Sequence, residues 1–428
     1  MRILHISTRL ILGGSQENTV LSCEGQARRG HEVHLAFGPI YGPEGSLLER
    51  VERFRTPDKR PISTHVVPDM IRAIHPLRDW RAYRQLIALI RATNPDIVHT
   101  HSSKAGVLGR AAAWACRSPA VIHTIHGPPF YTGQNPLVRR LYIESERFAA
   151  KRCHMIVSVA DAMTNQYLAE RIGTPERYIT VRSGMEVETF LHAAPGEDRA
   201  AMRSRLGLAD GDFVIGTVAR LAHQKGHDDL LDALAGQVRS DRRWKLLWIG
   251  DGWWRERLVS KARSLGLGVA ELDSGSAAQR SDRSGAQVII TGLVPPERVP
   301  GHMRAMDVLA HPSYREGLPR TVPQALLCGT PVVAYDTDGT GEACRDPARV
   351  GAAHATGLLV PPGNHPGLSA AIRWMHDHPA ERAAMAQRGR AWCAAEFAAE
   401  RMVADLEGVY ERAIQLARGS GRAAQPTP

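Results

Sequence analysis

The chain has 428 residues, of which 43% are hydrophobic and 23% charged, and its formal net charge is +10 at pH 7. This length exceeds what one hydrophobic core usually supports, so we expect two domains. No apolar run reaches the roughly 20 residues of a membrane span, and no signal-peptide pattern opens the sequence. The six cysteines are scattered and form no Cys-x-x-Cys pair, which favours a reducing, cytoplasmic location over a disulfide or zinc framework.

Short apolar or β-branched runs alternate with helix-like runs through the first half of the chain. The expected strands are residues 2–7, 32–37, 96–101, 120–126, 155–160 and 178–182. Helices are expected at residues 16–29, 105–116, 136–152 and 161–172. The alternation predicts βαβ units, and near-continuous apolar strands predict a parallel sheet that is covered on both faces.

The segment Gly13-Gly14-Ser15-Gln16 follows the first expected strand and precedes the first expected helix. Glycine lets a ligand approach the backbone closely, and a helix N-terminus favours negative charge. Tight turns use the same residues, and the segment differs from the dinucleotide fingerprint G-x-G-x-x-G. By itself it therefore fits either a ligand-binding loop or a simple turn.

Histidines gather on two neighbouring expected strands. His99 and His101 alternate along one strand and share a face, while His123 and His126 end the next. No carboxylate or cysteine accompanies them at ligand spacing, so we expect no metal site. His126 precedes a glycine at a strand end, where a neutral imidazole can hydrogen-bond sugar hydroxyls.

Residues 193–212 turn to Gly, Ala, Pro and charged residues, which predicts a linker and a short helix before a second series of strands. These strands are residues 213–220, 245–250, 288–291, 308–311 and 331–335. We therefore expect an α/β protein with two doubly wound halves, residues 1–195 and 205–395, and a ligand site in the cleft between them. Three other segments are a mobile polar insertion at 269–287, an amphipathic helix at about 398–417 and a disordered tail at 419–428.

Two stretches of the second half carry side chains that suit a nucleotide sugar. Arg220 and Lys225 leave one loop between a strand and a helix, and both cations suit a diphosphate, although two solvated surface charges are the alternative. Glu316 and Gln324 lie eight residues apart, which predicts two helical turns and nearly the same helix face. The triplet 336–338 resembles a metal-binding DxD pattern, but its place after a strand favours turn chemistry.

In this order the motifs resemble those of the family-four retaining glycosyltransferases of GT-B fold, in the glycogen-synthase and mannosyltransferase-like superfamily, over roughly residues 2–415. The matching stretches are GGSQ (13–16), VHTHSSKAGVLGR (98–110), VIHTIHG (121–127), TVRSGMEVETF (180–190), GTVARLAHQKGHDDLL (216–231), LLWIGDG (246–252), TGLVP (291–295) and HPSYREGLPRTVPQALLCGTPVVA (311–334). The resemblance implies two Rossmann-like domains. The N-terminal one would bind the acceptor and receive the final helix, and the C-terminal one would bind the nucleotide-diphosphate sugar.

The resemblance also implies roles for individual residues. The catalytic residues would be His126, Arg220, Lys225 and Glu316. The donor would be bound by Gly14, Arg220, Lys225, Gly250, Glu316, Gly317, Leu318 and Gln324. On the acceptor side would lie Gly13, Gln16, His101 and Lys104. Gln324 stands where the family usually has a second glutamate, so the ribose hydroxyls would meet an amide with one acceptor oxygen.

The implied activity is retaining sugar transfer from a UDP- or GDP-sugar to a glycan, lipid-linked or small-molecule acceptor, in cell-surface polysaccharide or glycoconjugate synthesis. No metal or other cofactor is implied, because the departing phosphate oxygen takes the acceptor proton in the family's proposed same-face mechanism. A non-catalytic GT-B scaffold is one alternative, which Gln324 would favour. An NAD-dependent oxidoreductase is another, which the missing G-x-G-x-x-G disfavours.

The positive charge is concentrated in residues 1–195, which hold 25 Lys and Arg against 17 Asp and Glu. No nucleic-acid motif accompanies it, so nucleic acid is not an expected partner. Residues 138–141 and 147–152 place several cations on one expected helix, which indicates an anionic or lipid-linked acceptor met peripherally at the inner membrane face. Ordinary surface solvation is the alternative explanation.

Overall fold

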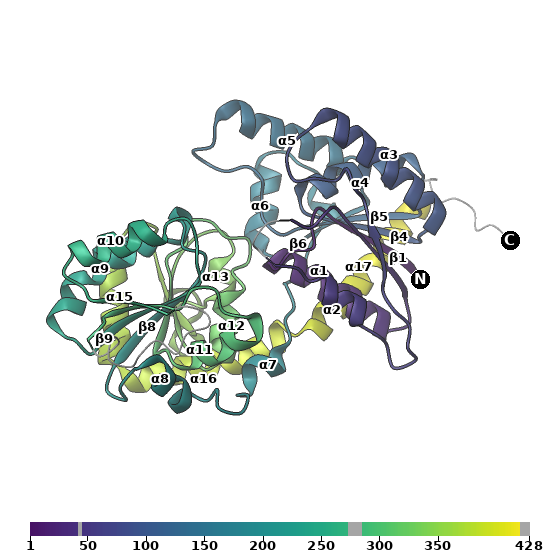
Figure 1. Ribbon diagram of the computed structural model, residues 1–428. Helices are drawn as coiled ribbons and strands as arrows, with labels where there is room; N and C mark the ends of the chain where they lie inside the picture. The colour runs from purple at the N-terminus through teal and green to yellow at the C-terminus, as the bar shows by residue number, and fades with distance from the viewer. Residues whose placement is uncertain (42–44, 273–284, 420–428) are drawn as a thin grey trace. The chain divides into compact units, whose positions relative to one another are not determined.

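The computed structural model describes residues 1–41, 45–272 and 285–419. They form two compact units (Figure 1). The first unit consists of Met1–Met185 and of the chain from Phe397 onward, and the second of Glu186–Glu396. Every helix in the described ranges is too short or too polar to span a bilayer.

A seven-stranded sheet forms the centre of the first unit, with the strand order β3-β2-β1-β4-β5-β6-β7. All of its neighbouring strands are parallel. The strands are β1 Arg2–Ser7, β2 Glu32–Phe37, β3 Ser63–Val66, β4 Ile97–His101, β5 Ala120–Ile125, β6 Met155–Ser158 and β7 Tyr178–Thr180. Every residue of β4, β5 and β6 is buried, as expected for inner strands that helices cover on both faces.

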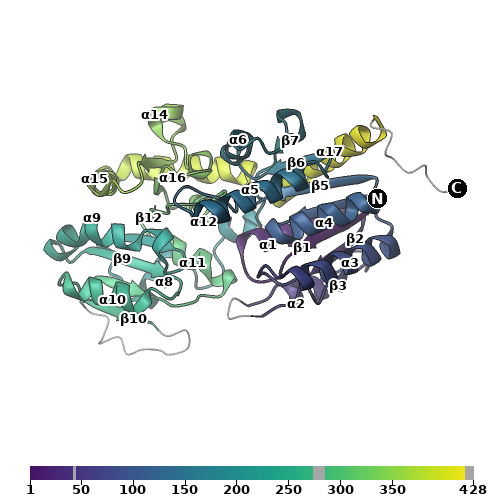
Figure 2. The same cartoon turned by 90° about the horizontal axis from the view of Figure 1, so that it is seen from above.

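The helices of the first unit lie on both faces of this sheet. They are α1 Gly14–Arg28, α2 Leu48–Arg53, α3 Pro76–Thr93, α4 Ser103–Ala115, α5 Pro136–Ala150, α6 Asp161–Ala169 and α17 Ala399–Gly419. The helices α3, α4 and α5 cover one face, and α1, α2 and α17 the other (Figure 1). Seen from above, α5, α4 and α3 lie side by side (Figure 2).

Helix α17 returns from the end of the chain to complete the core of the first unit. Its residues Val403 and Leu406 pack with Ile3 of β1, Ile97 of β4 and Ile122 of β5. The amphipathic pattern of residues 398–417 thus reflects a helix that buries one stripe against a sheet.

The second unit contains another sheet of seven parallel strands, in the order β10-β11-β9-β8-β12-β13-β14. The strands are β8 Phe213–Val218, β9 Trp244–Ile249, β10 Val269–Glu271, β11 Val288–Ile290, β12 Val308–His311, β13 Val332–Tyr335 and β14 Gly357–Val360. Two doubly wound parallel sheets confirm the predicted α/β fold class.

The helices of the second unit surround a core that includes Trp244, Trp248 and Leu230. They are α7 Val187–Leu191, α8 Arg199–Leu206, α9 His227–Ser240, α10 Arg255–Ser264, α11 Val299–Arg304, α12 Thr321–Leu327, α13 Thr340–Ala343, α14 Pro347–Val350, α15 His365–Asp377 and α16 Pro379–Glu396. Short 3-10 turns precede some of them, among them His223–Lys225 before α9.

The prediction of a mobile insertion over residues 269–287 is wrong at both ends of this range. Val269–Glu271 forms the edge strand β10, whose Val269 and Ala270 pair with Val288 and Ile289 of β11. Gln287 is buried and donates through Nε2 to the carbonyl of Val238, 2.9 Å away. Residues 273–284 lie outside the described residues, as does the expected tail from residue 420 on.

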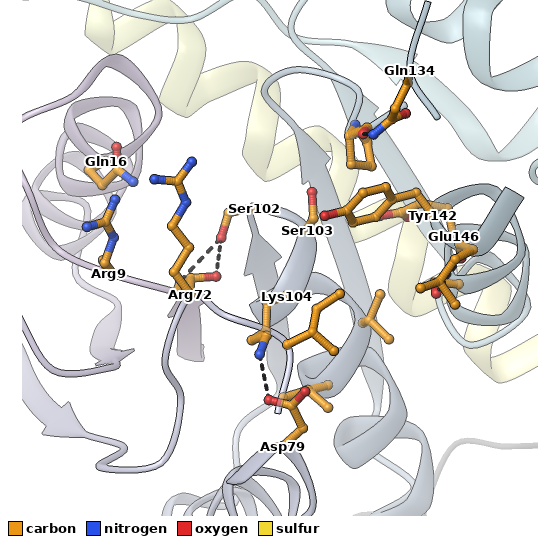
Figure 3. Close-up of a pocket in the computed structure, with 17 residues that line it drawn as sticks. Arg9, Gln16, Arg72, Asp79, Ser102, Ser103, Lys104, Gln134, Tyr142 and Glu146 are labelled. Atoms are coloured by element: carbon orange, nitrogen blue, oxygen red, sulfur yellow. Dashed lines mark hydrogen bonds and ion pairs between the residues drawn. The ribbon is translucent and has the colours of Figure 1, made fainter. Parts of the chain in front are cut away.

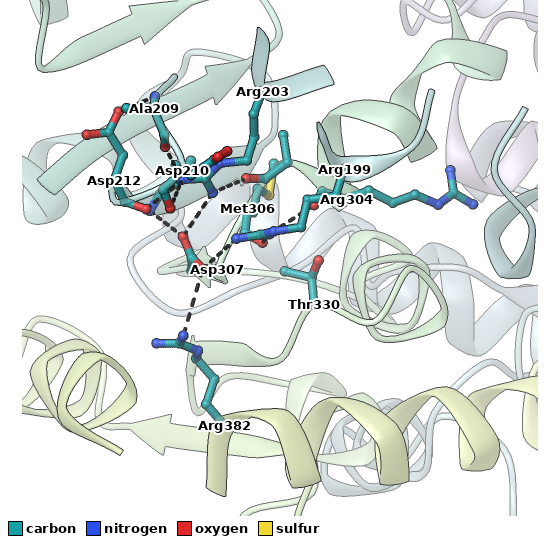
Figure 4. A network of polar contacts seen from close by, with 12 residues as sticks. Arg199, Arg203, Ala209, Asp210, Asp212, Arg304, Met306, Asp307, Thr330 and Arg382 are labelled. Atoms are coloured by element: carbon teal, nitrogen blue, oxygen red, sulfur yellow. Dashed lines mark hydrogen bonds and ion pairs between the residues drawn. The ribbon is translucent and has the colours of Figure 1, made fainter. Parts of the chain in front are cut away.

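Asp307, just before β12, forms ion pairs with the segment that we expected to be a linker, and these pairs hold that segment within the second unit (Figure 4). Its carboxylate lies 2.7 Å from Arg199 and 3.3 Å from Arg203 of α8, and 3.8 Å from Arg382 of α16. Arg203 is buried and also donates to the carbonyl of Asp212, 2.6 Å away. Residues 199–212 are therefore a packed part of the second unit.

The residues before α8 pack in the same unit. Arg304 of α11 donates to the carbonyls of Phe190 and His192, at 2.8 and 2.6 Å. These contacts explain why the first unit ends at Met185, whereas the sequence placed its end at residue 195.

Candidate functional site

A half-buried charged group in the second unit is centred on Glu316. Its Oε1 lies 2.5 Å from Nζ of Lys225 and 3.2 Å from Nε2 of His311, the latter without hydrogen-bond geometry. The Glu316 side chain is 15% exposed and that of Lys225 20%. Burial alone would raise the pKa of Glu316, but the Lys225 ammonium and His311 lower it well below its ordinary value. Glu316 is therefore a carboxylate at neutral pH.

Two loops that lock together position this ion pair. Lys225 precedes Gly226, whose φ of +69° lies in the left-handed region. A Cβ at Gly226 would lie 2.0 Å from the carbonyl oxygen of Pro312, so the two loops touch through their backbones. The carbonyl of Gln224 accepts hydrogen bonds from the backbone N–H of Tyr314 (2.9 Å) and the hydroxyl of Ser313 (3.1 Å). The distance between Lys225 and Glu316 is thus fixed by local backbone contacts.

A third loop holds Glu316 from the other side. Asp338 accepts a hydrogen bond from the backbone N–H of Glu316 at 2.8 Å, and Gly339 donates to the carbonyl of Gly317 at 3.1 Å. Asp336 forms an ion pair with Arg349. Both acidic side chains of the DxD-like triplet are therefore engaged in holding loops together.

The predicted helical spacing between Glu316 and Gln324 is wrong. Residues 316–319 form a loop, and α12 begins only at Thr321. Leu318 precedes Pro319, and the proline ring disfavours the helical conformation of the residue before it. Gln324 is the central residue of this seven-residue helix and is half-buried. The two residues do not share a helix face.

The other donor-side residues lie in different surroundings. The exposed Arg220 places its guanidinium over the ring of Trp253, 5.4 Å from the centroid. Gly250 has a φ of +137°, and a Cβ there would lie 2.2 Å from the carbonyl oxygen of Ala219, which accounts for the glycine by close backbone approach. Leu318 is buried. Of the residues expected to be catalytic, the structure brings together Lys225 and Glu316.

The first unit contains a pocket of about 570 Å³ (Figure 3). Gln16 of α1 and Lys104 of α4 both line it, and Nζ of Lys104 lies 2.6 Å from Oδ1 of Asp79. Arg9 and Arg72 lie beside Gln16 on one side (Figure 3). Sequence analysis missed the other polar lining residues, which are Thr8, Arg9, Arg72, Asp79, Ser102, Ser103, Gln134, Tyr142, Ser145 and Glu146.

The glycines that precede Gln16 shape the start of α1. Gly13 is the extended N-cap residue and Gly14 the first helical residue, so the helix begins two residues before its expected start at Gln16. A Cβ at Gly13 would lie 2.7 Å from Oε1 of Gln16. Gly13 therefore leaves room for the side chain that reaches the pocket.

His101 and His126 belong to a chain of hydrogen-bonded side chains in the first unit. Nε2 of His126 lies 3.1 Å from Nδ1 of His101, and Nε2 of His101 lies 2.9 Å from Nδ1 of His5. Nε2 of His5 is 2.7 Å from Oε1 of Gln26, whose amide nitrogen donates to Tyr410 at 2.8 Å. The chain thus runs from the end of β5 to the returning helix α17.

Burial keeps the imidazoles of His5, His99 and His101 neutral, since it lowers the pKa of His5 to about 4 and that of His99 and His101 well below the ordinary value. A neutral ring donates from one nitrogen and accepts at the other. With the Gln26 oxygen as acceptor, His5 donates from Nε2, His101 donates to His5, and His126 donates from Nε2 to His101. The network thereby assigns one tautomer to His5 and one to His101.

Nitrogen atoms of His5, His99 and His101 lie within 4.8 Å of one another, a spacing that a metal ion could also use. Both nitrogens of His99 are engaged, with Tyr410 at 2.7 Å and Thr124 at 2.7 Å. Those of His5 and His101 are engaged in the chain described above. These three rings would have to give up hydrogen bonds to bind a metal.

Comparison with known families matches both units. Residues 12–189 match the family described as Glycosyltransferase Family 4, and residues 212–378 match Glycosyl transferases group 1. A D-inositol 3-phosphate glycosyltransferase of Kineococcus radiotolerans is 30% identical over 344 residues, which are 77% of this chain and 74% of the relative. A 2-deoxystreptamine glucosyltransferase of Streptomyces kanamyceticus is 31% identical over 66% of this chain and 65% of the relative.

A third relative is the UDP-Gal:alpha-D-GlcNAc-diphosphoundecaprenol alpha-1,3-galactosyltransferase of Escherichia coli, 25% identical over 79% of this chain and 80% of the relative. Among solved structures, Anabaena HepE in complex with UDP-glucose has a TM-score of 0.75 at 19% identity, covering 96% of this chain and 99% of HepE. WaaG, a glycosyltransferase involved in lipopolysaccharide biosynthesis, has a TM-score of 0.65 at 16% identity, covering 98% and 100%. The chain belongs to the family 4 glycosyltransferases and has their GT-B fold.

Proposed function

We propose that this glycosyltransferase moves a sugar from a nucleotide-diphosphate sugar to its acceptor with retention of configuration and without a metal ion. The observation that carries the proposal is the Lys225–Glu316 pair, a cation and a carboxylate 2.5 Å apart in a half-buried site. UDP-sugars are the first donors to test. A UDP-glucose complex is known for HepE, and the E. coli relative is named for UDP-Gal.

In this proposal Lys225 stabilises the negative charge that develops on the leaving diphosphate. An ammonium group shielded from water acts more strongly on that charge than a solvated one. Arg220, from the same loop, would supply a second cation on leaving its place over Trp253. Glu316 is ionised and accepts hydrogen bonds from hydroxyls of the transferred sugar.

The proposed chemistry needs no separate protein base. The bond between the sugar's anomeric carbon and the phosphate oxygen breaks, and the acceptor oxygen bonds to that carbon from the same face. The acceptor proton passes to the departing phosphate oxygen. Glu316 is a poor proton acceptor because Lys225 and His311 hold its pKa low, so its suggested role is binding. His126, whose ring is held by a hydrogen bond with His101, would contact the transferred sugar.

We assign the acceptor to the pocket of the first unit. It offers the cations of Arg9, Arg72 and Lys104 together with hydroxyl and amide groups, which suits a hydroxylated acceptor that carries a phosphate. The names of the relatives mention inositol 3-phosphate and a diphosphoundecaprenol-linked sugar. Synthesis of a cell-surface polysaccharide or glycoconjugate is the biological role that we propose.

A donor screen tests this function. Purified enzyme is incubated with UDP- and GDP-sugars and cell-extract acceptors, with and without a chelator, and products are identified by mass spectrometry and the anomeric NMR coupling. We expect a chelator-insensitive product with the donor's anomeric configuration. Lys225→Ala should lower kcat/KM by about 100-fold or more, whereas Arg242→Ala at an exposed position of the same unit should leave it within about twofold. Full activity of Lys225→Ala, loss of activity on chelation, or an inverted product would each contradict the proposal.

A further inference from the structure

Exposed apolar side chains are concentrated on one face of the first unit. Eight of the fifteen large apolar side chains that are exposed among the described residues lie in α3, in α5 or in the segments that lead into them. They are Ile74, Leu77, Trp80, Tyr131, Leu137, Val138, Leu141 and Phe148. Leu137 is 79% exposed. Because α3 and α5 cover the same face of the sheet (Figure 1), these residues belong to one side of the unit.

The same segments are strongly basic. Residues 72–84 and 135–152 together contain nine Lys and Arg against three Asp and Glu. All three acidic residues are paired, Asp79 with Lys104, Glu146 with Arg110 and Glu144 with Arg147. Of the nine cations, Arg147 and Arg139 have carboxylate partners, the latter Glu170. Arg140 is exposed and forms no ion pair with a described carboxylate. The face therefore combines apolar side chains with uncompensated positive charge.

Along α5 the two kinds of side chain share one stripe. Leu137, Leu141 and Phe148 recur at helical spacing, with Arg140 and Lys151 on the same side. The guanidinium of Arg152 lies over the Phe148 ring, 3.5 Å from its centroid. The buried side of the helix carries Ile143 and Ala149 instead. Helix α5 thus presents an amphipathic outer surface whose polar side chains are mostly cationic, with the exposed Glu144, paired with Arg147, as the acidic exception among the described residues.

A basic hollow lies at the C-terminal end of this stripe. Its volume is about 600 Å³, and it is formed by the end of α5 and the segment after α6. Its cations are Arg147, Lys151, Arg152, Arg171 and Arg177, and among the described residues that line it Glu144 alone carries a carboxylate. Clustered arginine and lysine side chains of this kind suit the phosphate of a lipid head group.

We propose that this side of the first unit is a docking face for an anionic lipid bilayer. The docking face consists of Ile74, Leu77, Trp80, Leu137, Leu141 and Phe148 with the cations around them. Apolar side chains enter the boundary between head groups and acyl chains, while Lys and Arg bind lipid phosphates. Charge complementarity selects a bilayer with anionic lipids, because among the described residues only two cations of these segments, Arg139 and Arg147, have carboxylate partners.

Docking does not depend on the proposed sugar transfer, but it has a consequence for it. Ile74 and Leu141 of the docking face also line the pocket of the first unit. A lipid-linked acceptor would therefore reach the pocket from the bilayer side. This consequence rests on the proposed function, whereas membrane binding can be measured without any donor or acceptor.

Vesicle flotation of the full chain tests the docking face. The vesicles contain phosphatidylcholine alone or phosphatidylcholine mixed with phosphatidylglycerol. We expect at least about tenfold stronger binding to the mixed vesicles, and this preference should fall as salt is added. Equal binding to both vesicles, or binding to neither, would overturn the proposal.

Two charge-reversal variants locate the surface. Arg140→Glu with Lys151→Glu changes the net charge as much as Arg242→Glu with Arg373→Glu on exposed positions of the second unit. The first pair should weaken binding to anionic vesicles by at least about tenfold, and the second by less than about twofold. Equal losses in the two variants would show a general charge effect and refute the assigned face. Circular dichroism melting of both variants controls for folding.

The apolar component is tested by Leu137→Ser with Phe148→Ser. These exposed substitutions should weaken vesicle binding by at least about fivefold while leaving the melting temperature unchanged. Light scattering after size exclusion examines a second copy of the chain as the alternative occupant. A wild-type dimer that this variant converts to a monomer, without any change in vesicle binding, would assign the face to self-association and overturn the proposal.

Discussion

The Lys225–Glu316 pair allows a quantitative test of the preformed donor site. The perturbation is a double-mutant cycle made of Lys225→Met, Glu316→Gln and both together, studied without nucleotide sugar. In the structure the two groups lie 2.5 Å apart with side chains 20% and 15% exposed. Such a pair is neither a solvated surface ion pair nor fully buried, so its coupling energy should fall between those limits.

The magnitude follows from charge separation and burial. Two unit charges about 4 Å apart attract by about 4 kcal/mol at an effective dielectric constant of about 20. Desolvation removes a large part of this gain, which leaves an expected coupling energy of about 2 kcal/mol. Lys225→Met should be the more destabilising single change, because it leaves the Glu316 carboxylate without its ammonium partner in a half-buried site. The double variant should lose less stability than the sum of the two single variants.

The change in folding stability at acidic pH provides a second measurement, and its expected direction is defined. The folded-state pKa of Glu316 is lowered from its ordinary value of 4.5, so the ion pair stabilises the fold above that pH. This contribution is lost as the pH falls below 4.5 toward the folded-state pKa. The wild type should therefore lose stability on acidification more steeply than Glu316→Gln.

Urea unfolding followed by tryptophan fluorescence measures the cycle, because six of the eight tryptophans lie in the second unit. The signal therefore reports mainly on the unit that carries the pair. A coupling energy within about 0.5 kcal/mol of zero at neutral pH would refute the reasoning, since it would mean that solvent screens the pair. A coupling energy that stays constant through acidification would refute the assigned pKa shift.

Three further predictions concern stability. Because burial lowers the pKa of His5 from 6.5 to about 4, the first unit should lose about 3 kcal/mol from this residue as the pH falls through that interval, and His5→Gln should reduce this loss in melts across pH. Glu146→Gln leaves the Arg110 guanidinium buried without a carboxylate, so urea unfolding should show a loss of about 3 to 5 kcal/mol, and a loss below about 1 kcal/mol would contradict the buried pair. Gly226→Ala places a Cβ 2.0 Å from the carbonyl oxygen of Pro312 at a positive φ, and it should lower the stability of the second unit by at least about 2 kcal/mol, whereas an unchanged melting temperature would show that the loops can separate.

Local patterns were enough to predict most of the fold. Strands such as β1 and β12 are apolar runs that end at turn residues, and the predicted bounds match the structure. Strand β3 (Ser63–Val66) was missed, because three of its four residues are polar and none of the four is buried at the sheet edge. The helix expected to start near Glu316 begins at Thr321, because a helical pattern of apolar residues does not show the constraint that Pro319 places on Leu318.

Residues of the candidate site could be predicted where the charged side chain belongs to one short sequence motif. Lys225 and Glu316 belong to motifs, and the structure joins them. Residues that form hydrogen bonds across a long sequence separation belong to no common motif, so the sequence did not reveal those contacts. Tyr410 bonds to His99 although 311 positions separate them, and His5 joins the histidine chain only because β1 pairs with β4. Contacts of this kind follow from the order of strands in the sheet, which a single sequence does not specify.

The return of α17 to the first unit has a consequence for how the protein is made. Translation delivers the strands of the first sheet early, but Val403 and Leu406, which cover Ile3 and Ile97, leave the ribosome only after the whole second unit. During this interval an apolar stretch of the nascent sheet has no cover. The first unit must therefore wait for the last helix to finish folding, and a fragment that stops before residue 397 should survive only when that helix is supplied as a separate peptide.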